Sequence, residues 1–527
     1  MSDAPARLGV VGAGTMGSGI AQLGCLARME TFLHDPVADA LARGAERIRT
    51  GLDKGAKRGR WSAEDARAGA DRLRACEALE DLSPCELVVE AAPERLELKR
   101  ELFGRLSEVC DEGTVLATNT SSIPVTALVS AATRPENVVG MHFFNPAPLM
   151  RLVEVIRADG TSERALAVTR AAGEAMGRRV IEASDGPGFL VNRCGRPFGA
   201  EALRLLAEQV AAPEQIDRVC RLGGGFRMGP FELMDLVGVD VGLEVARSLH
   251  TQSFGEARWK PSPLQERLVS AGRLGRKTGR GWYRYDDGAH RPDDPESPSP
   301  GGGDGRVVAI EGAGALAAKL RERAAVAGWE AREPEALAGA APELVVDASV
   351  PAPAADPLAA ALGTATDGPP PLAVCADRSL AGRGEPEACG FNLLPPLGEA
   401  RLVELTRLPS TPDATTAAAE RFFSSLGMVV EWVEDAPGLV LGRIVCQLVN
   451  EAAFAIGEGV GSANDVDAGL TLGLNHPRGP VAWGRTIGLD HVLATIDGLW
   501  EERREERYRA APLLRRAVAT GSGLGDG

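Results

Sequence analysis

The sequence lacks several features that would assign it to a specialised class of protein. No apolar run in its 527 residues approaches the ~20 residues that a membrane-spanning helix needs. Basic residues are not in excess, since the net charge is −15, so we expect no generic nucleic-acid binding. The first residues lack the basic and apolar regions of a secretory signal. These absences predict a cytosolic, globular protein without a membrane or nucleic-acid partner.

The nine cysteines also lack the spacing of a metal site or a disulfide framework. None of them forms a CxxC pair, and no histidine stands at a metal-ligand distance from them in the sequence. We therefore expect reduced, structural thiols, no metal and no disulfide.

What the sequence does contain is one long stretch twice. A shift of 250 positions aligns residues 140–240 with residues 390–490 without a gap. Near its start, GMHFFNPAPLMRLVEV meets GFNLLPPLGEARLVEL. A period of this length indicates the duplication of whole domains rather than a solenoid.

Composition and pattern divide each half again. Residues 286–305 are almost entirely Pro, Gly, Asp and Ser, which predicts a flexible linker between the halves. Each half is expected to hold an α/β domain followed by a helical domain. The predicted boundaries are 1–185 and 186–285 in the first half, then 306–435 and 436–527 in the second.

The first α/β domain opens with a dinucleotide-binding pattern. The strand-like LGVV leads directly into GAGTMG, and a helical pattern follows. In such a loop Gly12 permits the tight turn, Gly14 lets the backbone approach a pyrophosphate, and Gly17 lets the helix pack closely on the strand. The N–H groups at the helix start would bind the phosphates. The loop residues expected to bind the cofactor are Gly12, Gly14, Thr15, Met16 and Gly17.

Asp35 stands eighteen residues after Gly17, at the end of the next predicted strand. A carboxylate there accepts hydrogen bonds from the adenine ribose and repels a 2′-phosphate, so NAD is predicted rather than NADP. The competing interpretation makes Asp35 a helix N-cap ahead of Pro36.

Polar side chains follow two later predicted strands. LVVEAAPERLELK places Glu94 and Lys99 after one of them, and TVLATNTSSIP places Asn119 and Ser121 after the other. Because α/β sheets bind ligands outside the carboxyl ends of their strands, these residues predict a cleft. Considered alone, TNTSS would be an ordinary turn and capping signal.

A histidine and a glutamate occupy matched positions in the next two predicted strands. If NVVGMHFF and LMRLVEVI pair antiparallel about Pro148, His142 and Glu154 lie opposite each other. An imidazole supported by a carboxylate is a general base, which suits oxidation of an alcohol with hydride transfer to nicotinamide. Asn192, in the helix start after PGFL, is expected to reach the cleft or to bond that helix start.

Seven motifs then follow one another over residues 7–285: GAGTMG, TNTSS, HFFNP, LVEV, PGFLVNR, MGPFELMDLVG and GRKTGRGWYRY. In this order the sequence resembles the L-3-hydroxyacyl-CoA dehydrogenase family. The resemblance implies a Rossmann-type domain and an all-α C-terminal domain like that of 6-phosphogluconate dehydrogenase. It also implies NAD-dependent oxidation of a (3S)-3-hydroxyacyl-CoA. LAEQVAAPEQID and EERYRAAPLLRRA are similar to a subgroup that oxidises 3-hydroxyadipyl-CoA in bacterial phenylacetate breakdown.

The resemblance further implies roles for individual residues. His142 and Glu154 would form the catalytic pair. Ser121 and Asn192 would contact the reacting hydroxyl or the thioester carbonyl. The cofactor would be lined by Asp35, Glu94, Lys99, Asn119 and Asn145, and the CoA nucleotide would lie on Lys57 and Arg58.

The second copy has lost the residues on which this chemistry depends. In order, His142, Asn192 and Gly17 become Asn392, Gly442 and Ala317. Glu404 remains, without an imidazole to orient. We expect this half neither to bind NAD tightly nor to turn over, and to serve as an internal partner for the first helical domain. A further homodimer is left open.

Other interpretations stay open at this point. A 3-hydroxybutyryl-CoA or general β-oxidation dehydrogenase would share the chemistry, and Arg151, Arg193 or Arg196 would each be a candidate for binding a terminal carboxylate. An NAD-binding structural or sensor protein on a retired enzyme fold belongs to another class. A 2-hydroxyacid or sugar-acid dehydrogenase would not call for HFFNP together with LVEV.

Overall fold

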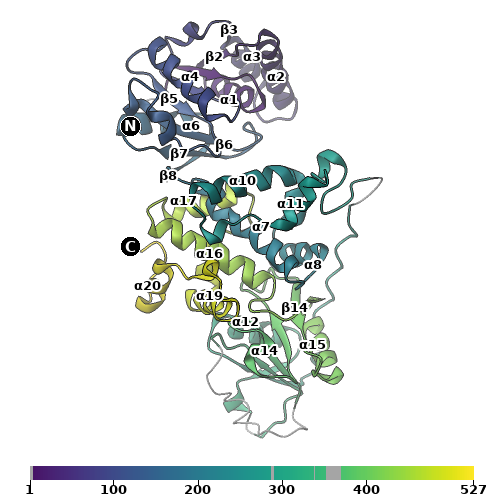
Figure 1. Cartoon of the computed structure of the whole chain (residues 1–527). Helices are drawn as coiled ribbons and strands as arrows, with labels where there is room; N and C mark the ends of the chain where they lie inside the picture. The colour runs from purple at the N-terminus through teal and green to yellow at the C-terminus, as the bar shows by residue number, and fades with distance from the viewer. Residues whose placement is uncertain (1–3, 287–289, 338, 352–368, 527) are drawn as a thin grey trace. The chain divides into compact units, whose positions relative to one another are not determined.

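The computed structural model describes residues 4–286, 290–337, 339–351 and 369–526. Three residues of the predicted linker, 287–289, lie outside the described residues. The chain divides into two compact units, each considered by itself (Figure 1). The first consists of Met1–Arg193 with Gly459–Leu474, and the second of Cys194–Glu458 with Asn475–Gly527.

The first unit is built on an eight-stranded sheet in the order β3-β2-β1-β4-β5-β6-β7-β8. Adjacent strands are parallel except for β6 and β7, which are antiparallel. The order reverses beside β1, as it does in doubly wound nucleotide-binding sheets. The strands are β1 Arg7–Val11, β2 Glu30–His34, β3 Leu73–Cys76, β4 Leu87–Glu90, β5 Val115–Thr118, β6 Val138–Phe143, β7 Leu152–Arg157 and β8 Arg179–Ser184.

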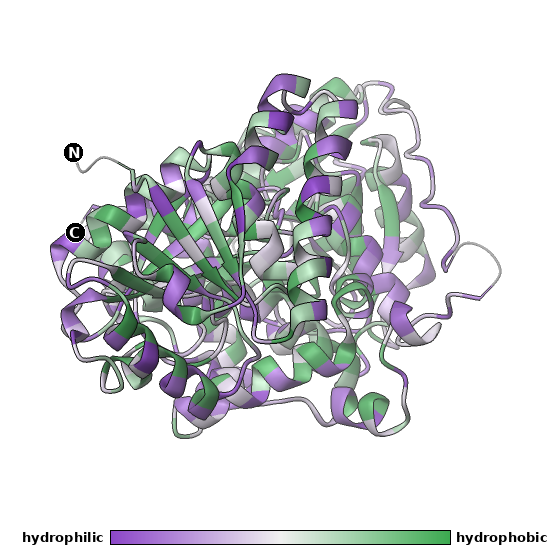
Figure 2. Cartoon of the chain, turned by 90° about the horizontal axis from the view of Figure 1, so that it is seen from above, coloured by the Kyte–Doolittle hydropathy of each residue, from purple (hydrophilic) through white to green (hydrophobic). Residues whose placement is uncertain are grey.

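The burial of the central strands accounts for their amino-acid composition. β4, β5 and β6 are buried along their whole length, so their sequences are nearly continuous apolar runs. Figure 2 colours the chain by hydropathy, with hydrophobic residues green. The helices of this unit are α1 Thr15–Leu26, α2 Ala38–Lys57, α3 Ala63–Asp71, α4 Leu96–Val109, α5 Thr126–Val129 and α6 Glu163–Ala175. Two helical turns from the second half complete it, α17 Ala463–Ala468 and η7 Gly469–Gly473.

The second unit contains a seven-stranded sheet in the order β10-β9-β11-β12-β13-β14-β15. This order reproduces that of the first sheet without the outer strand β3. The strands are β9 Val307–Glu311, β10 Glu330–Arg332, β11 Leu344–Asp347, β12 Pro371–Val374, β13 Cys389–Asn392, β14 Leu402–Thr406 and β15 Val429–Trp432, and α12 Ala315–Val326 and α15 Asp413–Ser425 accompany them. The predicted duplication of the α/β domain is confirmed by this topology.

The helical domains repeat with the same register. α7 Val191–Ala207 and α16 Leu441–Gly457 begin and end 250 residues apart, as do α9 Pro230–Val237 and α18 Pro480–Ile487. The short helices α8 Pro213–Arg218 and η3 Val219–Gly223 match α17 and η7 in the same way. The remaining helices of the second unit include α10 Val239–Gln252, α11 Pro263–Ser270, α19 Leu489–Arg503 and α20 Pro512–Thr520.

The described part of the predicted linker makes polar contacts with the helical domain. Glu232 of α9 accepts hydrogen bonds from His290 (2.9 Å) and Arg291 (2.7 Å), and it also pairs with Arg221. Burial alone would raise the pKa of the Glu232 carboxyl, but these cationic partners and the Gly229 amide lower it to about 2. Charged residues of this Pro- and Gly-rich segment thus form hydrogen bonds with the helical domain.

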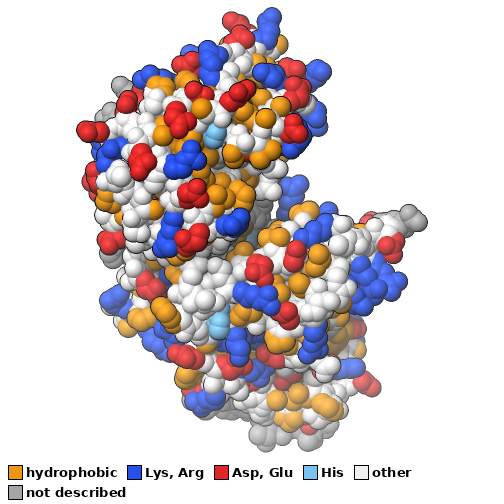
Figure 3. Space-filling model, turned by 45° about the horizontal axis from the view of Figure 1, so that its top comes forward, with side chains coloured by type: hydrophobic (Ala, Val, Ile, Leu, Met, Phe, Trp, Pro, Cys, Tyr) orange, Lys and Arg blue, Asp and Glu red, His pale blue; other side chains and the backbone are white. Residues whose placement is uncertain are grey.

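The described residues show the following surface and composition. On the face drawn in Figure 3, acidic and basic side chains are interspersed. The nine cysteines are all buried. Among the described residues, no helix combines the length and apolar character needed to cross a membrane.

Candidate active site

The centre of the candidate site is a hydrogen-bonded imidazole and carboxylate on β6 and β7. The two strands pair antiparallel with His142 opposite Glu154, which confirms the predicted register. His142 Nδ1 lies 2.7 Å from Glu154 Oε2, and the two residues are 5% and 0% exposed. An ionised Glu154 accepts the Nδ1 proton and leaves the lone pair of Nε2 for another proton. No described residue hydrogen-bonds Nε2.

The other oxygen of Glu154 anchors the start of helix α7. Glu154 Oε1 accepts hydrogen bonds from the backbone N–H groups of Leu190 (3.1 Å) and Val191 (3.0 Å). Asn192 follows immediately and is half-buried in the first turn. One carboxylate therefore fixes both the orientation of the base and the helix turn that carries the predicted substrate-binding amide.

Two aromatic rings that the sequence analysis did not single out lie beside the imidazole. The ring of Phe144 is centred 4.6 Å from that of His142, and the ring of Phe189 is centred 6.0 Å away. Both are largely buried, so they limit the access of water to the imidazole. The repeat held a signal for them, because the positions 250 residues later are Leu394 and Leu439, where the histidine is also lost.

The glycine loop has the geometry that a dinucleotide needs. Gly12 has a φ of 101°, and a Cβ on Gly17 would lie 1.8 Å from the Gly12 carbonyl oxygen, so both positions require glycine. A Cβ on Gly14 would meet nothing within 4 Å, which leaves the open space expected where a pyrophosphate approaches. Thr15 is exposed and Met16 half-buried at the start of α1. The loop fits the phosphates of NAD.

Asp35 is fixed beside this loop. Its Oδ2 accepts a hydrogen bond from the Ala13 N–H (2.9 Å), and its Oδ1 accepts one from the Val37 N–H (3.0 Å). The N-cap of α2 is Val37, so Asp35 is not the N-cap that the competing interpretation proposed. Each carboxylate oxygen has a second acceptor position, which fits a ribose hydroxyl.

A second carboxylate organises the loop that follows β5. Glu94 Oε1 accepts hydrogen bonds from Thr120 Oγ1 (2.5 Å), the Ser121 N–H (3.1 Å) and Ser122 Oγ (2.9 Å). Partial burial opposes ionisation, but the charge of Lys99 and these bonds outweigh it and lower the pKa of the Glu94 carboxyl. Predicted residues from two strand ends are thus brought together, with Ser121 half-buried beside Glu94.

Lys99 forms ion pairs with Glu94 and with a second carboxylate, that of Glu90. Its ammonium is 1% exposed, lies 3.3 Å from Glu94 and donates to both oxygens of Glu90 at 2.7 and 2.9 Å. Glu90 is fully buried at the end of β4 and also accepts from Thr118. The sequence analysis missed Glu90, although an acid in the apolar strand LVVE is the signal. Direct contact of Lys99 with the cofactor stays a prediction.

The other predicted positions are more peripheral. Asn119 Oδ1 accepts from the Phe143 N–H (2.8 Å), so that side chain ties β5 to β6 beside the imidazole. Asn145 is exposed in the turn between β6 and β7. Lys57 and Arg58 are exposed at the C-terminal end of α2, and their contact with CoA stays a prediction.

Comparison with known proteins agrees with this geometry. The model of the 3-hydroxyacyl-CoA dehydrogenase NAD-binding domain matches residues 7–186. The model of the C-terminal domain of the same family matches twice, over residues 188–285 and 438–524. The chain belongs to the 3-hydroxyacyl-CoA dehydrogenase family. It is therefore an NAD-dependent oxidoreductase, as its motifs predicted.

Individual relatives match over different lengths. The chain is 35% identical over 519 residues to 3-hydroxyadipyl-CoA dehydrogenase of Escherichia coli (strain K12), covering 98% of each protein. It is 41% identical to a probable 3-hydroxybutyryl-CoA dehydrogenase of Deinococcus radiodurans, over 53% of this chain and 100% of that one. The crystal structure of 3-hydroxybutyryl-CoA dehydrogenase from Escherichia coli K12 superposes with a TM-score of 0.78 at 32% identity, covering 99% of both chains.

In the second half of this dehydrogenase, an asparagine occupies the position equivalent to His142. Asn392 lies opposite Glu404 in the sheet, and its Nδ2 is 3.3 Å from Glu404 Oε2 and 3.2 Å from the Gly438 oxygen. A Cβ on Gly442 would lie 2.9 Å from that Nδ2. The glycine that replaces Asn192 therefore makes room for the asparagine that replaces the histidine.

Glu404 binds the start of a helix, as Glu154 does. Its Oε1 accepts the Val440 N–H at 2.6 Å at the start of α16. Burial raises the pKa of the Glu404 carboxyl to about 7, although the backbone bonds from Val440 and Leu441 favour the ionised form. Asn392 Oδ1 has no hydrogen-bond partner among the described residues.

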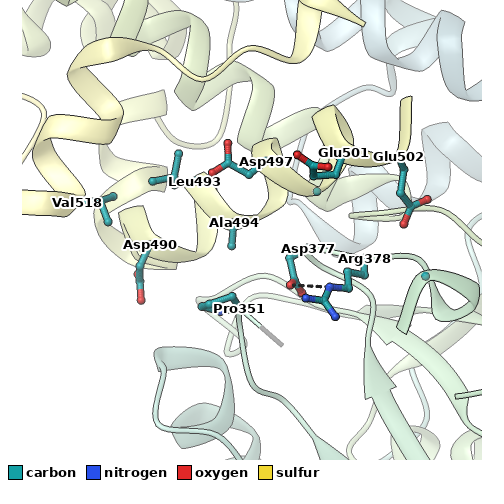
Figure 4. A pocket seen from close by; sticks show the side chains of 12 residues that line it. Pro351, Asp377, Arg378, Asp490, Leu493, Ala494, Asp497, Glu501, Glu502 and Val518 are labelled. Carbon is teal, nitrogen blue, oxygen red and sulfur yellow. Dashed lines mark ion pairs between the residues drawn. The ribbon is translucent and has the colours of Figure 1, made fainter. Parts of the chain in front are cut away.

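A cavity of about 560 Å³ lies between α19 and the loop after β12 in the second half (Figure 4). Helix α19 contacts that loop directly, because a Cβ on Gly498 would lie 1.7 Å from the Asp377 oxygen. Carboxylates line the cavity and would repel the phosphates of a dinucleotide or of CoA. They belong to Asp377, Asp490, Asp497, Glu501 and Glu502.

We predict that His142→Gln abolishes most of the activity while the cofactor still binds. Loss of a general base costs about 10²–10⁴ in rate, and the glycine loop that binds NAD is untouched. Turnover of acetoacetyl-CoA with NADH, followed by absorbance, measures the first effect, and NADH fluorescence titration measures the second. Turnover close to that of the wild type would remove His142 from its role.

A matched pair of substitutions tests the assignment of the carboxylates. Glu154→Gln is expected to lower kcat by about 10²-fold or more, because the imidazolium formed in the reaction loses its counter-charge. Glu404→Gln, the same change 250 residues later, is expected to leave kcat within twofold of the wild type. Equal losses in the two variants would contradict the inactivity of the second half.

The raised pKa of Glu404 predicts a pH-dependent effect on stability. A carboxyl whose pKa rises from 4.5 to about 7 on folding weakens the folded state as pH increases between those values. Glu404→Gln removes this decrease in the free energy of unfolding, which amounts to at most about 3 kcal/mol. The decrease in the thermal unfolding midpoint from pH 5 to pH 8 should therefore be smaller in the variant than in the wild type. Identical pH dependence in both proteins would refute the shift.

Proposed function

We propose that the chain oxidises (3S)-3-hydroxyadipyl-CoA to 3-oxoadipyl-CoA with NAD. The observation that carries this proposal is the similarity to Escherichia coli 3-hydroxyadipyl-CoA dehydrogenase over 98% of both chains, degenerate half included. The relatives named as 3-hydroxybutyryl-CoA dehydrogenases in Bacillus subtilis and Deinococcus radiodurans match over 53% of this chain.

The catalytic geometry supports a general-base mechanism. Because Glu154 holds Nδ1 of His142, Nε2 is the nitrogen that takes the hydroxyl proton, and the charge that forms on the ring faces a carboxylate. Bound NAD supplies the acceptor for the hydride that leaves the same carbon. Phe144 and Phe189 exclude water beside the ring, which strengthens the attraction between imidazolium and carboxylate.

Ser121 and Asn192 are proposed to hold the substrate oxygens. The Ser121 backbone is bonded to Glu94 and the turn that carries Asn192 is bonded to Glu154, so both side chains start from fixed backbone. Side chains positioned in this way lose little freedom when they bind the hydroxyl and the thioester carbonyl.

We further infer that the two helical copies act as an internal dimer. Arg443 of α16 is fully buried, with its Nε 3.0 Å from Oε2 of Glu201 in α7 and its Nη1 2.7 Å from Oε2 of Glu208, which follows α7. Tyr508 adds a bond to the same guanidinium at 2.6 Å. A buried arginine paired with two carboxylates is costly to separate, which supports a permanent association of the copies.

A second candidate substrate is 3-hydroxybutyryl-CoA. It is favoured by the full-length superposition on an Escherichia coli structure that carries that name.

Kinetics with matched substrates decide between the two. We expect kcat/KM to be at least tenfold higher with (3S)-3-hydroxyadipyl-CoA than with (3S)-3-hydroxybutyryl-CoA, both measured with NAD. Since a terminal carboxylate is the main difference, the preference should shrink in high salt, which screens exposed charges. A preference for the butyryl ester would overturn the adipyl assignment and leave the reaction class intact.

A further inference from the structure

A segment from the second half of the chain packs against β7, the strand that carries Glu154, and against its neighbour β8. Residues 459–474, which include α17 and η7, belong to the second half by sequence and to the first compact unit by contact. The Ser184 N–H at the end of β8 donates to the Val460 oxygen at 2.8 Å, and Ser184 Oγ donates to the Gly459 oxygen at 3.0 Å. Asp465 pairs with Arg179 at 3.6 Å.

Glycines let this segment approach the site more closely than any side chain would allow. A Cβ on Gly461 would lie 2.7 Å from Leu190 Cδ2, and one on Gly469 would lie 2.8 Å from Val191 Cγ2. A Cβ on Gly473 would lie 2.9 Å from a methyl of Leu152 and 3.6 Å from the ring of Phe144.

The residues touched are those that hold the catalytic pair. Leu190 and Val191 donate the two backbone N–H groups that Glu154 accepts, and the Phe144 ring lies against His142. Leu190 and Val191 are 0% exposed, so the segment is part of their packing. A shift of Val191 would therefore move a hydrogen-bond donor of Glu154, and Glu154 orients the base.

The reciprocal contact exists on the inactive half, and it uses larger residues. The Glu434 N–H donates to the Val210 oxygen at 2.8 Å, which repeats the bond between Ser184 and Val460 at an offset of 250. The residues equivalent to Gly461 and Gly469 are Ala211 and Val219. Two of the three glycines that approach the working site are thus larger in the reciprocal segment, whereas Gly473 is matched by Gly223.

We propose that residues 459–474 act as a positioning element for the His142–Glu154 pair, so that the degenerate half takes part in catalysis by holding the base in place. Gly469 and Gly473 are positioning residues in this sense, since they act through the side chains of Val191, Leu152 and Phe144. The inference rests on the proposed function only in taking His142 as the base, and it is independent of the acyl chain.

The test is Gly469→Val, which inserts the residue found at the equivalent position 219. Its added methyls must displace Val191, and a misplacement of about 1 Å costs about 10²-fold in rate. We expect kcat for acetoacetyl-CoA reduction to fall about 10- to 100-fold, with the KM for NADH and the NADH dissociation constant unchanged. Gly473→Ala is the milder variant, with a smaller loss of kcat.

The matched control is Gly224→Ala. A Cβ there would lie 2.8 Å from Leu441 Cδ1, and Leu441 is the counterpart of Val191 in the inactive half. A comparable fall in the unfolding midpoint with kcat unchanged is expected. The double variant Gly469→Val with Val191→Ala keeps the N–H and removes the clash, so it should regain most of the lost kcat.

Two results would overturn the proposal. One is a Gly469→Val protein that binds NADH and keeps the wild-type kcat. The other is an equal loss of kcat in Gly224→Ala, which would reduce the effect to general destabilisation. Wild-type protein that fails to reduce acetoacetyl-CoA would instead refute the proposed function, so the two failures are distinguishable.

Discussion

The structure around the site depends on the carboxylate of Glu154. Its side chain is fully buried, and a carboxylate in that environment is costly unless donors satisfy it. Three donors do so: the imidazole of His142 and the backbone N–H groups of Leu190 and Val191. The same charge that makes the histidine an effective base therefore also fixes the start of the helical domain. In the first half, the base and the helix start are thus held by one group.

The second half shows what remains when the chemical demand is removed. Glu404 still accepts backbone N–H groups at the start of α16, because that helix still needs an anchor. Its histidine partner has become Asn392, and Gly442 leaves the space that this amide occupies. The Glu404 carboxyl has no imidazole partner, and burial raises its pKa. Retention of the glutamate follows from packing, whereas loss of the histidine follows from the absence of a reaction.

Charged side chains are arranged differently in the two halves. In the first, Gly14 leaves open space at a helix N-terminus, which attracts phosphate. The buried Lys99 pairs with Glu90 and Glu94, and its charge helps to lower the pKa of the Glu94 carboxyl that binds the loop after β5. In the second, carboxylates line the cavity beside α19. The open space at the glycine loop is common to both copies, since a Cβ on Gly314 would also meet nothing within 4 Å.

The sequence by itself determined the duplication, the glycine loop, Asp35 and the pairing of His142 with Glu154. These features are local or periodic: a strand pairs by counting residues from its turn, and a glycine loop is read within six positions. Only the tertiary structure decided that Glu90 lies under Lys99, that Leu190 and Val191 complete the bonds of Glu154, and that residues 459–474 cover the catalytic strand. Such contacts join residues separated by up to several hundred positions, and no spacing in the chain encodes them, because they arise only when buried groups must find partners.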